Sequence, residues 1–186
     1  LLQTVVSKKH SLKTNFATDL PAIEGDPAQL SQVIMNLITN ASEAIGESNG
    51  TITLSSGLIS VDREYLADAY LSSETPEGVY VYLRVTDSGC GMDEETLSRI
   101  FDPFFTTKGS QKGTGLGLSI SRNIITEHGG NLELLEVYSK VNLFLKSYYE
   151  IFYKFDIEKL NWMNGQYIKK MDVEEILSLL SLRGGL

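Results

Sequence analysis

The chain has 186 residues, 42% of them apolar and 22% charged, which is typical of a soluble globular protein with one sizeable domain and an appendage. Its formal net charge of −8 and pI near 4.8 disfavour non-specific nucleic-acid binding through a basic surface. No run of about 18 apolar residues is present, so no membrane segment is predicted. The single cysteine, Cys90, excludes an internal disulfide and fits a reducing compartment. We therefore expect a cytoplasmic protein, whether or not a longer parent is anchored in a membrane.

Hydrophobic periodicity and turn residues predict the secondary structure. Asp26-Pro27 predicts a helix start, with Asp26 as N-cap and Pro27 at the first helical position. The predicted elements are a strand over 11–20, a helix over 26–47, strands over 51–61 and 79–86, a short helix over 93–100, a helix over 116–127 and a strand over 131–137. A polar insertion over 62–78 and a mobile stretch over 108–113 are expected between them. The pattern predicts an α+β fold, a two-layer α/β sandwich with helices on one face of a mixed, mostly antiparallel sheet.

Residues 138–186 have a different composition, rich in Tyr, Phe, Leu and Lys. They predict a tail of two or three helices, with a capping box over 172–175. No closing strand is recognisable after residue 137, unless residues 141–145 replace it. We therefore expect two units, residues 1–137 and residues 138–186.

Four short patterns occur in a fixed order between Gln32 and Gly130. They are Asn36-Leu-Ile-Thr-Asn40-Ala-Ser-Glu-Ala44, Asp87-Ser-Gly89-Cys-Gly91, Phe101-Asp-Pro-Phe104-Phe105-Thr-Thr-Lys108 and Gly113-Thr114-Gly115-Leu116-Gly117-Leu118. Each pattern alone is a weak signal, and their combination carries the interpretation.

The first pattern places Asn36 and Asn40 one helical turn apart, at the rim of the apolar face of the first long helix. A carboxamide oxygen is a neutral, hard ligand that suits Mg²⁺, which also takes phosphate oxygens. The alternative from the helix alone is that both asparagines lie at an ordinary polar boundary.

The second pattern puts the carboxylate of Asp87 directly after an apolar strand. There it can accept a hydrogen bond from an exocyclic amine, while Gly89 and Gly91 let the backbone approach a flat base. The alternative is a simple Asp-Ser-Gly turn.

The fourth pattern places three glycines before a helix whose free N–H groups can hold phosphate oxygens. It is neither a P-loop nor a dinucleotide-binding fingerprint. Lys108 and Lys112 flank the mobile stretch and can add positive charge, unless they are ordinary surface lysines.

Together the four patterns resemble the N, G1, F and G2 boxes of the ATP-binding catalytic domain of sensor histidine kinases, which has the Bergerat fold of the GHKL ATPases. The resemblance covers about residues 1–136. It implies that Asn40 binds Mg²⁺, that Asn36 and Asn40 are the catalytic asparagines, and that Asp87 contacts the adenine amino group. The ATP-binding residues that it implies are Asn36, Asn40, Asp87, Gly89, Gly91, Lys108, Gly113, Thr114, Gly115, Leu116 and Gly117. It also implies that Phe101, Phe104 and Phe105 anchor an ATP lid, and the alternative is that they are ordinary core residues.

The activity that this resemblance implies is transfer of the ATP γ-phosphoryl group to a histidine on a separate dimerisation domain, within a two-component system that ends at a response regulator. Neither histidine of this chain matches the phosphoacceptor. His128, at a helix end where a cation is favoured, is expected to be structural, and His10 is expected on the surface. We therefore expect the chain to be inactive in isolation.

Two alternatives to a kinase remain. Hydrolases of the same fold carry a glutamate base four residues before the metal-binding asparagine, and the residue here is Asn36, which cannot take a proton from water. A non-catalytic nucleotide-binding or interaction module is the other alternative, and the missing closing strand favours it. Separately, residues 155–172 resemble a segment of glutamyl-tRNA synthetases, without the ATP-site signatures of those enzymes.

Overall fold

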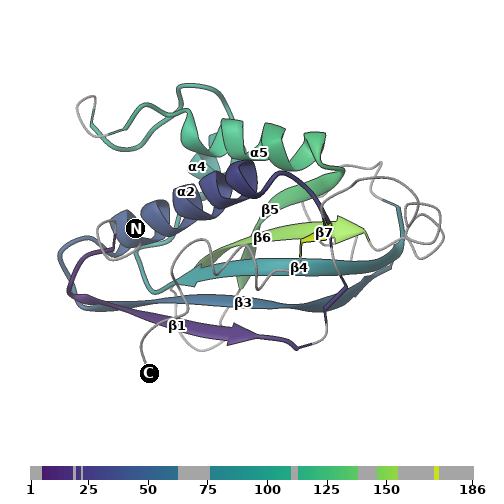
Figure 1. Ribbon diagram of the computed structural model, residues 1–186. Helices are drawn as coiled ribbons and strands as arrows, with labels where there is room; N and C mark the ends of the chain where they lie inside the picture. Colours follow the sequence, from purple (N-terminus) through teal and green to yellow (C-terminus); the bar gives the residue numbers. More distant parts are fainter. Residues whose placement is uncertain are drawn as a thin grey trace.

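The computed structural model describes residues 6–18, 20–21, 23–62, 76–109, 113–137, 146–154 and 170–171. Its elements are β1 (His10–Phe16), β2 (Ile23–Glu24), α2 (Pro27–Ile45), β3 (Gly50–Val61), β4 (Gly78–Asp87), α4 (Glu94–Arg99), α5 (Gly117–Glu127), β5 (Gly130–Val137), β6 (Lys146–Lys154) and β7 (Lys170–Met171). Figure 1 shows the three helices on the same side of the main sheet. The predicted two-layer α+β sandwich is therefore confirmed.

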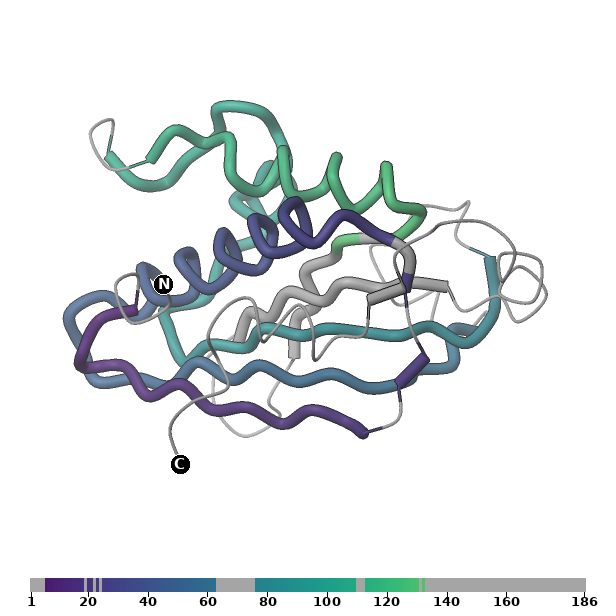
Figure 2. Tube along the Cα trace, in the orientation of Figure 1, coloured from purple at the N-terminus to yellow at the C-terminus, as the bar shows by residue number. Residues whose placement is uncertain are grey.

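The main sheet has the strand order β1-β3-β4-β6-β5. Strand β1 runs parallel to β3, and all the other neighbours in this sheet are antiparallel, as predicted. Figure 2 shows β1, in purple, along the sheet edge beside β3. The short strands β2 and β7 form a separate antiparallel pair that the sequence did not predict.

Strand β6 corrects the prediction for the tail, because residues 146–154 form a strand and not a helix. It lies between β4 and β5, with Arg84 paired to Glu150 and Leu132 paired to Ile151. Its run of tyrosine, isoleucine and phenylalanine has high strand propensity, which pairing on both sides reinforces. The prediction of an incomplete sheet is therefore also wrong. Residues 138–145, 155–169 and 172–186 lie outside the described residues, as do the predicted capping box and most of the polar insertion.

Helix α2 begins where the sequence predicted. The Asp26 side chain accepts hydrogen bonds from the backbone N–H groups of Ala28 and Gln29, at 2.8 and 3.3 Å. The helix ends at Ile45, slightly before the predicted end, because Gly46 adopts a positive φ of 69° as its C-cap. The apolar face of α2 packs on the sheet and supplies much of the core, with Leu30, Val33, Ile34, Leu37, Ile38, Ala41 and Ile45. This packing determines which side of α2 is free to line a functional site.

The two histidines differ in how well they were predicted. His128 is structural, as expected, and its Nε2 accepts the Asp26 backbone N–H at 3.0 Å while Nδ1 contacts the Ile124 carbonyl oxygen at 2.7 Å. The ring thus joins the N-terminus of α2 to the C-terminal end of α5. The surface prediction for His10 is wrong. Its ring is buried, with Nδ1 2.9 Å from Ser42 Oγ and Nε2 3.0 Å from the Gly46 carbonyl oxygen.

Candidate functional site

A cleft of about 450 Å³ opens between α2, the loop after β4 and the segment that leads into α5. It brings together all four sequence patterns, although they are far apart in the chain. The lining residues are Asn40, Glu43, Ala44, Asp87, Cys90, Gly91, Met92, Thr96, Ile100, Phe105, Thr106, Thr107, Lys108, Gly113, Thr114, Gly115, Gly117 and Leu118. Of the residues implicated from the sequence, Asn40, Asp87, Gly91, Lys108, Gly113, Thr114, Gly115 and Gly117 line it.

Asp87 ends strand β4 and lines the cleft, with only 5% of its surface exposed. Its Oδ1 accepts the Gly89 backbone N–H at 2.8 Å. Burial raises the pKa of the Asp87 carboxyl group above its ordinary value, and the Gly89 hydrogen bond offsets part of that rise. A buried carboxylate that lines an apolar cleft is well placed to accept a hydrogen bond from a ligand amine.

Gly89 is not among the residues that line the cleft, and it packs closely against α2. A Cβ at this position would lie 2.6 Å from the backbone C and O atoms of Ala44 on α2. The next residue, Cys90, donates its backbone N–H to the Ala44 carbonyl oxygen at 3.2 Å. The glycine thus lets the loop after β4 press against α2, and this contact joins two walls of the cleft.

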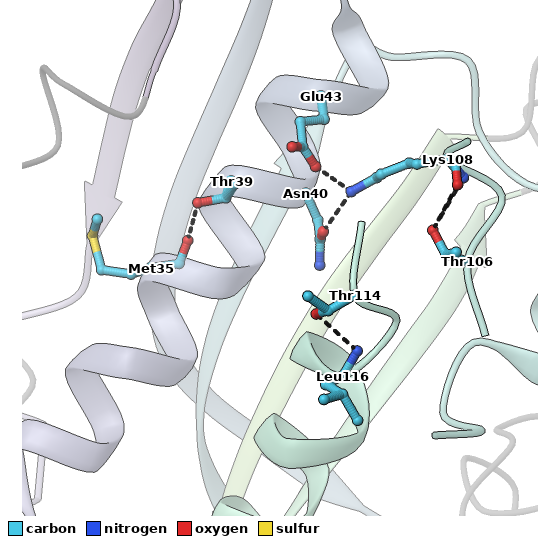
Figure 3. Close-up of polar contacts among 8 residues, drawn as sticks. All are labelled: Met35, Thr39, Asn40, Glu43, Thr106, Lys108, Thr114 and Leu116. Carbon is cyan, nitrogen blue, oxygen red and sulfur yellow. Dashed lines mark hydrogen bonds and ion pairs between the residues drawn. The ribbon is translucent and has the colours of Figure 1, made fainter. Parts of the chain in front are cut away.

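Asn40 and Lys108 also line the cleft and contact each other. The Lys108 ammonium donates to Asn40 Oδ1 at 3.0 Å and also forms an ion pair with the Glu43 carboxylate. Figure 3 shows the lysine reaching from its loop toward both side chains on α2. The carboxamide oxygen of Asn40 is therefore oriented to receive a cation.

Asn36 lies one turn before Asn40 but does not line the cleft among the described residues. Its Nδ2 donates to Ser121 Oγ at 3.2 Å and to the Gly117 carbonyl oxygen at 3.4 Å. Both acceptors belong to the start of α5, so Asn36 ties α2 to that helix. The sequence placed Asn36 in a ligand site, and in the structure its side chain contacts Gly117, which lines the cleft.

The glycine-rich segment supplies the N-terminus of α5. The N-cap residue, Leu116, has no side-chain capping bond, so the first N–H groups of this helix have no side-chain acceptor at that position. Leu116 is not among the described residues that line the cleft. Its backbone N–H donates to Thr114 Oγ1 at 3.4 Å (Figure 3). Uncapped N–H groups and the positive end of the helix dipole favour an anion here.

The phenylalanines of the third pattern do not act alike. Phe101 and Phe105 pack against the core, as the core alternative predicts. That alternative is wrong for Phe104, which is 74% exposed. Phe104 has a positive φ of 67°, and its backbone N–H donates to the Gly115 carbonyl oxygen at 2.9 Å. The contribution of Phe104 is therefore a backbone link across the base of the glycine-rich segment.

Sequence reasoning missed Glu43 and Ser121, which contact the predicted residues Lys108 and Asn36. A signal for Glu43 was present, because it lies three residues after Asn40 and thus on the same helix face. The sequence holds no comparable signal for Ser121, whose importance follows from the packing of α5 on α2.

Comparison with known proteins assigns the family. Residues 25–148 match the family of histidine kinase-, DNA gyrase B- and HSP90-like ATPases. The chain belongs to this family. The predicted Bergerat, or GHKL, relationship is thereby confirmed, and the match extends past the predicted boundary at residue 137 into β6.

Relatives of this ATPase-family chain include sensor kinases. It is 37% identical over 142 residues to the sensor histidine kinase ZraS of Escherichia coli strain K12, covering 76% of this chain and 26% of that kinase. It is 42% identical over 132 residues to the sensor kinase CckA of Brucella abortus strain 2308, covering 70% of this chain and 13% of that kinase. The chain thus spans roughly a quarter or less of the length of these relatives.

Solved structures agree on the fold. The nucleotide-free catalytic domain of the histidine kinase ThkA has a TM-score of 0.57 and 28% identity, and the match covers 82% of each chain. The resemblance of residues 155–172 to glutamyl-tRNA synthetases finds no support in these comparisons. In the part of the chain that the structure describes, no helix combines the length and apolar character needed to cross a membrane.

Proposed function

We propose that this chain is the ATP-binding catalytic domain of a two-component sensor histidine kinase. It would transfer the γ-phosphoryl group of Mg·ATP to a histidine on a separate dimerisation domain. The observation that carries the proposal is one cleft lined both by a buried carboxylate, Asp87, and by the Asn40 and Lys108 pair. An adenine and a chain of phosphates need these two kinds of group within one site.

Mg²⁺ fits the donor chemistry of this cleft. The Oδ1 atom of Asn40 already accepts a hydrogen bond from a cation, the Lys108 ammonium. Asn40 would therefore hold the metal, together with phosphate oxygens and water. When bound, the metal would neutralise charge on the β- and γ-phosphates.

The protein groups bind, orient and neutralise charge, and none of them needs to move a proton. Asp87 accepts a hydrogen bond from the adenine amino group, and Gly91, at a positive φ of 71°, leaves room beside the base. The phosphates lie against Gly113, Thr114, Gly115 and Gly117 and against the N-terminus of α5, and Lys108 adds a positive charge. Catalysis by such a site is positioning together with electrostatic stabilisation.

Asn36 favours phosphotransfer over hydrolysis. It occupies the position of the glutamate base of related hydrolases, and a carboxamide cannot accept a proton from water. Its Nδ2 is bound to α5, which supports a role in positioning that helix. The non-catalytic alternative loses its main argument, because β6 completes the sheet.

The wider assignments belong to the same proposal. The ATP-binding unit comprises residues 1–137 together with β6, and β7, from the predicted tail, pairs with β2 of that unit. The partners are ATP, the phosphoacceptor domain and a response regulator, and the location is the cytoplasm.

The test is phosphotransfer to a supplied acceptor. The chain is mixed with Mg²⁺ and γ-labelled ATP, with and without the dimerisation domain of a similar sensor kinase. We expect acid-labile label on the acceptor histidine, and none when that histidine is replaced by glutamine. Steady release of inorganic phosphate without labelling of the acceptor would favour the hydrolase alternative.

A further inference from the structure

Glu43 is a cleft residue to which the nucleotide chemistry above assigns no role. It lies on α2 three residues after Asn40, so both side chains leave the same face of the helix. Its carboxylate and Asn40 Oδ1 together hold the Lys108 ammonium, which comes from a loop 65 residues further along the chain. The lysine and glutamate side chains are 35% and 42% exposed.

This contact conflicts with the use of the same groups for nucleotide. Lys108 cannot remain between Glu43 and Asn40 while it neutralises phosphate oxygens. A metal ion on Asn40 Oδ1 would also share that oxygen with the ammonium and repel it. The ion pair must therefore break when Mg·nucleotide enters the cleft, and its free energy opposes binding.

We propose that Glu43 is a positioning residue that holds Lys108 against Asn40 while the cleft is free of nucleotide, and releases the lysine when nucleotide binds. The proposal rests on the proposed function, in which Asn40 and Lys108 contact the metal and the phosphates. Glu43 then keeps the cation beside the cleft, at the cost of weaker nucleotide binding.

Nucleotide titration in a double-mutant cycle tests this. Glu43→Gln keeps the shape of the side chain and removes its charge. Because partly exposed ion pairs contribute little, we expect Mg·ADP to bind only about two- to fivefold more tightly. In the Lys108→Met background, Glu43→Gln is expected to change the affinity by less than about 1.5-fold, since no pair is left to break. Glu47→Gln is the matched control, because Glu47 lies just beyond α2 and pairs with Lys9 instead.

Two titration results would overturn the proposal. One is weaker Mg·ADP binding by Glu43→Gln, which would make Glu43 a metal ligand. The other is an equal gain in Mg·ADP affinity from Glu43→Gln with and without Lys108. That result would show that Glu43 weakens binding only by repelling the phosphates.

A second measurement does not depend on nucleotide binding. Amine acylation of the nucleotide-free chain, quantified by mass spectrometry, is expected to modify Lys108 about two- to fivefold faster in Glu43→Gln than in the wild type. Lys9 serves as the internal reference. Equal rates at Lys108 would refute the holding role, whereas absence of ADP binding by the wild type would refute only the proposed function.

Discussion

Asn36 Nδ2 donates a hydrogen bond to Ser121 Oγ at 3.2 Å, and this contact joins the helix of the first pattern to the helix of the fourth. At the other end of α5, the Asp26 N–H donates to the Nε2 of His128, the C-cap residue, at 3.0 Å. The two links show that α2 and α5 run antiparallel, with α5 joined near each of its ends to the first half of α2. They therefore fix the position of the start of α5, which lines the cleft, relative to α2.

Ser121→Ala tests the first of these links. Ser121 is fully buried, and its loss leaves Asn36 with only the longer bond to the Gly117 carbonyl oxygen. We expect the free energy of unfolding in urea to fall by about 1–2 kcal/mol. Ser119→Ala is the matched control, because the Ser119 hydroxyl donates to the Leu116 carbonyl oxygen within its own helix, where removal costs little. Equal losses for the two variants would contradict a link between helices.

Gly89→Ala tests the contact between the loop after β4 and α2. The added Cβ would lie 2.6 Å from the Ala44 backbone, which cannot move without shifting the helix. We expect a loss of about 1–3 kcal/mol in the free energy of unfolding. Gly109→Ala is the control, since a Cβ there meets no atom within 4 Å. If both variants unfold at the same denaturant concentration as the wild type, the loop does not depend on this contact.

The stability of Asp87→Asn relative to the wild type is expected to depend on pH. Burial raises the pKa of Asp87 in the folded protein, so the folded state binds this proton more tightly than the unfolded state does. The bound proton therefore stabilises the fold, and this contribution is fully present below the unfolded-state pKa. That contribution is lost as pH rises through the folded pKa, and at neutral pH the buried carboxylate destabilises the fold. Asp87→Asn keeps an oxygen for the Gly89 N–H, so we expect it to be more stable than the wild type at neutral pH.

Denaturant unfolding at several pH values measures this. The advantage of Asp87→Asn is expected to shrink as the pH falls through the folded pKa. A variant that is less stable by a constant amount at every pH would show that the carboxylate stabilises the free protein.

Both histidines of the chain are expected to stay unlabelled when the isolated chain is incubated with γ-labelled ATP. Each ring has both nitrogens in contact with polar groups of the protein, and His10 is buried. Mass spectrometry of the labelled chain locates any phosphohistidine. Label on His10 or His128 would show that the chain carries its own phosphoacceptor, and a His10→Gln variant would then distinguish the two sites.

Local chemistry explains which features the sequence predicted. The start of α2 follows from Asp26 and Pro27 alone, because an N-cap and a proline at the first position act within one turn. The cleft could be predicted from four patterns whose order is diagnostic. Strand β6 could not be predicted, because residues 146–154 form a strand through pairing with β4 and β5, which are contributed by other parts of the chain. The burial of His10 and the Lys108–Glu43 pair also arise from contacts between distant segments.

The most direct measurement of the central claim is calorimetric titration of the chain with Mg·ADP and Mg·GDP, for the wild type and Asp87→Asn. The account predicts that the wild type binds ADP and strongly prefers it to GDP, because adenine presents to the Asp87 carboxylate a donating amine where guanine presents a carbonyl oxygen, which only accepts. It predicts that Asp87→Asn loses most of this preference, since its amide presents a donor where an acceptor is needed. Equal affinity of the wild type and Asp87→Asn for ADP would contradict the placement of adenine at Asp87.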